Sequence, residues 1–113
     1  MTALIAYSKT VGWDVTSGTF SFFLESMREA LEPVSPELAE WVIGYKENVI
    51  MLPLYKLTPV QLDVFVSAFR DMLAAKRDMG PQHSLWRSPA AYHAFVDHAG
   101  KFLRELTEAR RAE

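Results

Sequence analysis

Three times along the chain, a hydroxyl-bearing residue stands directly before a proline, at Ser35-Pro36, Thr58-Pro59 and Ser88-Pro89. The hydroxyl oxygen of such a residue accepts a hydrogen bond from a free amide at the start of a helix. Proline fits the first helical position because the donor that it lacks is not used there. Gln61 follows Thr58 by three residues and completes a capping-box pattern. The sequence therefore predicts helices that begin at residues 35, 58 and 88.

Apolar residues recur at helical spacing after each of these signals, and in one further segment before them. The first helix is predicted to be capped by Thr16, Ser17 or Thr19 and to end before Pro33. The third ends at Gly80-Pro81, and the last few residues of the fourth, 110–113, are expected to fray. The four predicted apolar faces consist of Phe20, Phe23, Leu24, Met27, Ala30 and Leu31; Leu38, Trp41, Val42, Tyr45 and Val49; Leu62, Phe65, Phe69, Met72 and Leu73; and Tyr92, Phe95, Val96, Ala99, Phe102, Leu103 and Leu106.

Two further apolar segments, residues 3–7 and 49–54, do not fit the helical pattern. We expect them to be buried connections, with a minor two-stranded β ribbon between them as the alternative. Pro53 would restrict the second segment to the edge of such a ribbon. The predicted fold is therefore mostly all-α, a compact bundle of four amphipathic helices that forms a single domain over residues 1–113.

The composition excludes several classes of function. The formal net charge is −2 and the pI is about 5.9, whereas general nucleic-acid binding needs an excess of positive charge. The chain has no cysteine, and therefore no disulfide or thiolate chemistry. Neither a signal peptide nor an apolar run long enough to span a membrane is evident. We expect a cytoplasmic protein that binds neither nucleic acid nor membrane.

The sequence contains no recognisable catalytic motif. His93 and His98 are five residues apart and would point in different directions from a helix, and His83 falls in a loop. His93 and Asp97 have the spacing of half a metal site, but a solvated helix face is the simpler interpretation. We predict that the protein is not an enzyme and that it binds neither a metal nor a cofactor.

The acidic residues are distributed unevenly along the chain. Between residues 14 and 40 there are six acids and a single base, Arg28, which gives a local net charge of −5. Residues 58–113 hold seven acids and eight bases, a net charge of +1. Like charges that gather in one region repel one another, and a partner with a positive surface is one explanation for such a region. The predicted binding residues are Asp14, Glu25, Glu29, Glu32, Glu37 and Glu40.

Two aromatic residues near these acids are candidate anchors for a partner. Trp13 falls in a segment of small and polar residues, predicted to be a loop, and Phe22 lies off the predicted apolar face of the first helix. For Trp13, the alternative is a side chain that folds back onto the helices. We add both residues to the predicted binding surface.

Two segments, LIAYSKTVGWDVTSGTFSFFLESM and LYKLTPVQLDVFVSAFRDML, resemble small bacterial immunity proteins. Such proteins neutralise the toxins of type VI secretion, contact-dependent inhibition and other polymorphic-toxin systems. Short immunity-like proteins share a hydrophobic run, a Thr-Pro or Ser-Pro helix start and an amphipathic helix. The resemblance implies stoichiometric binding that blocks the active cleft of a cognate toxin domain, and a basic cleft would suit the acidic segment.

Three hypotheses for function follow. The first is an immunity protein that docks its acidic surface on a toxin. The second is a small helical regulatory or adaptor protein with another partner, including a second copy of itself; the sequence leaves the oligomeric state open. The third is an enzyme or small-ligand carrier that uses His93 and Asp97.

Overall fold

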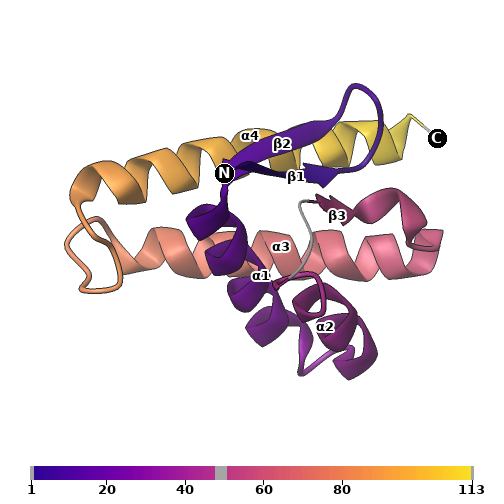
Figure 1. Cartoon of the computed structure of the whole chain (residues 1–113), viewed down its shortest axis with the longest axis horizontal. Coiled ribbons are helices and arrows are strands. Elements are labelled where there is room, and N and C mark those ends of the chain that lie inside the picture. Colours follow the sequence, from indigo (N-terminus) through magenta and orange to yellow (C-terminus); the bar gives the residue numbers. More distant parts are fainter. Residues whose placement is uncertain (1, 48–50, 113) are drawn as a thin grey trace.

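The computed structural model describes residues 2–47 and 51–112. Over these residues the chain is mostly helical, with four α-helices and one small sheet of three strands (Figure 1). The elements are β1 (Thr2–Ala6), β2 (Gly12–Thr16), α1 (Ser17–Leu31), α2 (Pro36–Ile43), β3 (Met51–Pro53), a single 3-10 turn η1 (Leu54–Lys56), α3 (Pro59–Met79) and α4 (Pro89–Arg111).

The predicted helix starts are confirmed. The hydroxyls of Ser35, Thr58 and Ser88 accept hydrogen bonds from the amides three residues on, those of Leu38, Gln61 and Ala91. The side chain of Gln61 also accepts a bond from the Thr58 amide, so the predicted capping box is present. Of the three candidates at the first helix, Thr16 is the cap, because its hydroxyl accepts from the Thr19 amide.

Two predicted helix ends differ from the structure. Helix α2 ends at Ile43, well before Val49, and Val49 lies outside the described residues. Helix α4 continues to Arg111, so the predicted fraying is wrong for residues 110 and 111. The reason is a contact distant in sequence: the Arg110 guanidinium donates a hydrogen bond of 2.7 Å to Oδ1 of Asp63 on α3. That ion pair fixes the end of α4 against α3.

Strand β1 lies at the centre of the sheet, in the order β2-β1-β3. It pairs in parallel with β3, with Ile5 opposite Leu52, so the predicted ribbon between these two segments forms over residues 4–6 and 51–53. Residues 49 and 50 lie outside the described residues. Pro53 is at the end of an edge strand, where the missing amide donor is not needed. Strand β2 was not predicted; it pairs antiparallel with β1 and places Trp13 opposite Ile5.

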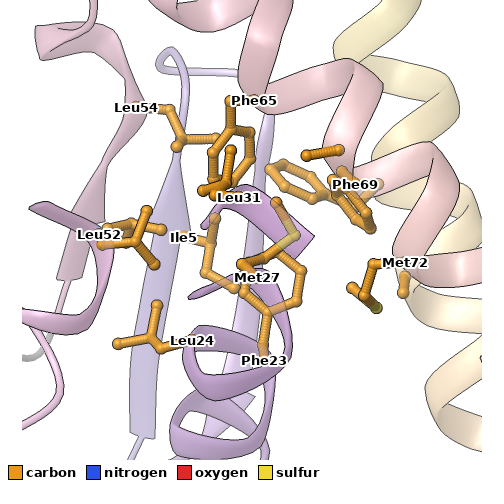
Figure 2. Packing of buried hydrophobic residues seen from close by; sticks show 14 of the residues in the cluster. Ile5, Phe23, Leu24, Met27, Leu31, Leu52, Leu54, Phe65, Phe69 and Met72 are labelled. Carbon is orange, nitrogen blue, oxygen red and sulfur yellow. The ribbon is translucent and has the colours of Figure 1, made fainter. Parts of the chain in front are cut away.

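The core lies between the sheet, α1 and α3 (Figure 2). Helices α3 and α4 run side by side as a long hairpin, and α1 crosses α3 (Figure 1). Helix α1 also packs against α2 and the sheet. The helices thus form two hairpins that meet where α1 crosses α3, with the sheet against α1, and a single four-helix bundle is not confirmed. The largest fully buried side chains come from the sheet and η1, α1, α3 and α4: Ile5, Leu52, Leu54, Phe23, Leu24, Met27, Leu31, Phe65, Phe69, Leu73, Phe102 and Leu106.

Candidate protein-binding surface

The outer side of α1 carries three of the predicted binding residues. Glu25, Glu29 and Glu32 follow one another at four and three residues, a spacing that places them on one side of a helix. All three are exposed. They lie there because the opposite side of α1, from Phe20 to Leu31, is buried in the core. The fold therefore directs these carboxylates into solvent.

Two further predicted acids, Glu37 and Glu40, project from α2. Both are exposed, whereas Leu38, Ala39 and Val42 of the same helix are buried. Helices α1 and α2 pack against each other, joined by a short turn at residues 32–35. The structure thus brings five of the six predicted acids onto one helical hairpin. We call Glu25, Glu29, Glu32, Glu37 and Glu40 the acidic face.

Two basic side chains partly neutralise the acidic face. Nζ of Lys46, in the turn after α2, donates a hydrogen bond to Oε1 of Glu25. Nη1 of Arg28 lies 3.8 Å from Oε1 of Glu32, the residue that follows α1. The other three acids, at positions 29, 37 and 40, have no ion pair among the residues that the structure describes. Five carboxylates against these two bases leave a local net charge of −3.

The contact with Lys46 changes the titration of Glu25. The hydrogen bond from the ammonium group and its positive charge lower the pKa of Glu25 below the ordinary value of 4.5. Glu25 therefore remains ionised at pH values where an isolated glutamate begins to bind a proton. The small contribution of this pair to folding is complete above the unfolded-state pKa and is lost as the pH falls through the folded-state pKa.

Replacing Lys46 with alanine is expected to raise the pKa of Glu25 towards 4.5, because both the donor and the positive charge are removed. An NMR titration of the glutamate side-chain carboxyl carbons measures this change. Lys56→Ala removes an exposed lysine from η1 and is the matched control, with no expected effect on the Glu25 pKa. If Lys46→Ala leaves that pKa unchanged, the ion pair does not form in solution.

The remaining predicted acid, Asp14, is not part of the acidic face. It is exposed on β2, where it borders a shallow hollow together with His98 and Lys101 of α4. Its neighbour Trp13 belongs to the same strand, so the predicted loop at this position is wrong. The Trp13 ring is half-buried and packs edge-on against Phe23, with a centroid distance of 5.6 Å. Trp13 therefore folds back onto the core, as the alternative prediction for this residue had it, and does not project as an anchor.

Phe22 is also not a projecting anchor. Its ring is half-buried and contacts Phe95 and Trp86 at centroid distances of 5.0 and 5.5 Å. The Nζ atom of Lys76 on α3 lies 5.3 Å from the same ring centroid, in a cation–π contact. Phe22 lies off the main apolar face of α1 because it packs on the α3–α4 hairpin instead of on the sheet.

A groove next to the acidic face was not predicted. It has a volume of about 400 Å³ and opens between α2, the α1–α2 turn and the start of α3. Val34 and Val60 are 66% and 74% exposed in it, the highest values among the exposed large hydrophobic residues. We call it the α2–α3 groove, and its apolar lining consists of Val34, Leu38, Trp41, Leu57, Val60 and Val64.

Polar groups border the α2–α3 groove. Glu37 belongs to the acidic face and also lines the groove, so the two surfaces are continuous. Lys56 and Gln61 lie among the other lining residues. The Trp41 ring is partly exposed and stacks edge-on with Tyr45 at a centroid distance of 5.0 Å. An apolar hollow with an aromatic wall and a charged rim is the usual composition of a protein-binding site.

Of the candidate groups for chemistry, His98 borders the hollow between β2 and α4 together with Asp14, Lys101 and Glu105. His93, Asp97 and His98 are all exposed on α4. Within residues 2–47 and 51–112, no group of three or more histidine, aspartate or glutamate side chains converges as a metal site would require. Among the same residues, no helix has the length and apolar character needed to cross a membrane.

Comparisons with protein-family models, with curated proteins and with solved structures each find no match for this chain.

Proposed function

We propose that this chain is an immunity protein, which binds a cognate bacterial toxin domain and neutralises it by covering its active cleft. The observation that supports this proposal most strongly is the acidic face beside the α2–α3 groove. Glu29, Glu37 and Glu40 are exposed carboxylates with no ion pair among the described residues, so a basic surface of a partner could pair with them. The polymorphic-toxin context comes from the resemblance of the sequence, and the cytoplasm is the proposed site of action.

Charge and apolar contact have separate roles in such a complex. Opposite charge on two surfaces speeds their encounter and rejects wrong partners, but contributes modestly to final affinity. Affinity comes chiefly from a few buried apolar or aromatic anchors surrounded by polar residues. The hairpin of α1 and α2 supplies both, because Glu37 lines the same groove as Trp41.

A regulatory or adaptor protein that pairs with a second copy of itself is the alternative. In a twofold dimer the same surface patch meets itself, and the glutamates around the groove would then approach one another. This repulsion favours a partner of a different kind. Light scattering separates the two cases: we expect the mass of one chain, 12.9 kDa, whereas a stable dimer would favour the alternative.

The experiment that tests the proposal uses the protein encoded by the reading frame next to that of this chain, which the proposal expects to end in a toxin domain. Purified together, the two proteins are expected to form a complex with one copy of each, and the toxic activity should disappear at equimolar addition. A Val60→Asp or Glu29→Lys variant at equal concentration shows whether the same surface is required. Failure to form a complex, or a complex that leaves the toxic activity intact, would contradict the proposal.

A further inference from the structure

The α2–α3 groove exposes apolar surface that the fold does not need. Single exposed apolar residues are normal on a protein surface, but a concentration of them in one hollow indicates a binding site. Val34 lies in the turn before α2, and Val60 lies at the second position of α3. Both positions face solvent, where a polar residue would serve the fold as well. Their exposure therefore has no explanation within this chain.

The shape of the groove limits what can occupy it. A volume of about 400 Å³ is at the small end of the range for ligand pockets, and is large enough for one or two apolar side chains. The walls come from helix α2 on one side and from Leu57, Val60 and Val64 on the other. The two walls are open to solvent at the two valines, so a side chain can enter without displacing core residues.

The charges around the groove indicate the chemistry of the occupant. Glu37 lines the groove, and Glu40 follows one turn further along α2, with both carboxylates exposed. Among the residues that line the groove, Glu37 is the one acid and Lys56 the one base, so the excess of negative charge on the α2 side comes from Glu40, next to the lining. A partner segment with lysine or arginine beside its apolar residues would complement this rim, whereas an acidic segment would be repelled.

We propose that the α2–α3 groove binds apolar side chains of a basic, amphipathic segment of a protein partner. This inference rests on the proposed function, for which it names the anchoring site and the character of the partner's contact region. The apolar side chains pack between Trp41 and Val60 and exclude water from both. The flanking basic residues then lie within reach of Glu37 and Glu40.

Three synthetic peptides of about four helical turns test this proposal without the toxin. The first has leucine at helical spacing with lysine elsewhere. The second replaces lysine with glutamate, and the third replaces leucine with alanine. The readout is the indole N–H signal of each tryptophan in a two-dimensional NMR spectrum. Trp41 reports on the groove, while Trp13 and Trp86 report on two other regions.

We expect the lysine–leucine peptide to shift the Trp41 indole signal and to leave those of Trp13 and Trp86 in place. The glutamate peptide should produce no shift, and the lysine–alanine peptide should bind at least about tenfold more weakly, because the apolar anchor is absent. Binding by all three peptides alike, a shift of Trp86 in place of Trp41, or no binding would each overturn the proposal.

A pair of variants tests the location of binding. Val60→Asp places a charge inside the groove, yet an acidic side chain in the first turn of a helix is favourable, so the fold should be retained. Leu85→Asp changes another exposed apolar residue, 44% exposed and outside the groove, and is the matched control. We expect at least about tenfold weaker peptide binding for Val60→Asp alone; equal binding by both variants would overturn the proposal.

The peptide experiment tests the groove proposal, and the toxin experiment tests the proposed function, so a negative result in one does not decide the other. If the peptides do not bind but the toxin domain still forms its complex, the groove proposal is wrong and the proposed function stands. If the peptides bind at Trp41 but no toxin complex forms, the groove binds a basic segment of a different protein.

Discussion

Phe69→Ala is expected to lower the free energy of unfolding by about 3–5 kcal/mol, the usual cost of removing a buried phenylalanine ring. Phe69 is fully buried on α3. Its ring lies 5.1 Å from that of Phe23 on α1 and 6.1 Å from that of Phe102 on α4, measured between centroids. The substitution leaves a cavity where three helices meet, so both helical hairpins lose packing together.

Urea unfolding followed by circular dichroism measures this loss. Arg70→Ala, at the next and exposed position of the same helix, is the matched control and should change stability by less than about 0.5 kcal/mol. If Phe69→Ala does not fold, Phe69→Leu retains part of the ring's volume and should show a smaller loss in the same direction. Equal stability of the alanine variants at positions 69 and 70 would contradict the described core.

The helix starts could be predicted because their signals are local. A capping hydroxyl, a proline and an apolar face lie within a few residues of one another, and each acts on the backbone beside it. The start of α3 at Pro59 and its end at Gly80 followed from the sequence for this reason. The end of α4 depends on a contact that is distant in sequence, that of Arg110 with Asp63, and could not be predicted in this way. Helix α2 has a local cap at Gly44, whose amide donates back to the carbonyl of Glu40, and the sequence prediction missed this glycine.

Strand β2 was missed because its composition is unfavourable for a strand. Gly12, Asp14 and Thr16 are exposed, Trp13 is half-buried, and only Val15 is buried. The strand forms because β1 offers a backbone edge to pair with, which is a tertiary effect that overrides local preference. The alternation of Trp13 and Val15, two residues apart, was the one signal of a strand in this segment.

The candidate surface was predicted in part. The acidic residues of α1 and α2 are where the sequence placed them, because acids opposite an apolar face must point into solvent. The α2–α3 groove could not be predicted, since its walls come from two separate segments, within residues 34–41 and 56–64, that the fold brings together. One feature of the sequence could have indicated the groove: Val60 and Val64 are four residues apart on α3 and lie off its predicted apolar face.

Reversing the charge of the acidic face is expected to slow association with the proposed toxin partner by about tenfold or more at low salt. The variant combines Glu29→Lys, Glu32→Lys and Glu40→Lys, all exposed, and leaves the groove unchanged. Positions 32 and 40 lie at or near the C-terminal ends of α1 and α2, where the helix dipole favours a positive charge. The fold should therefore be retained. The reversed face repels the basic surface of the partner at long range, so the two proteins meet less often.

A control variant changes the net charge of the chain by the same amount elsewhere. Asp78→Lys, Asp97→Lys and Glu108→Lys alter exposed acids of α3 and α4 with no ion pair among the described residues. Each triple variant changes the formal net charge from −2 to +4. A difference between the two variants therefore reports the position of the charges and not their sum.

The central claim is that this molecule acts by presenting its acidic face to a basic surface of another protein. Stopped-flow association rates measured at about 0.1 M and about 1 M ionic strength test it most directly, because salt shortens the range of charge interactions from about 10 Å to about 3 Å. We expect the association rate of the unaltered chain to fall steeply with salt, and the variant at positions 29, 32 and 40 to be slow at both salt concentrations. Equal rates and equal salt dependence for the unaltered chain and that variant would contradict the claim.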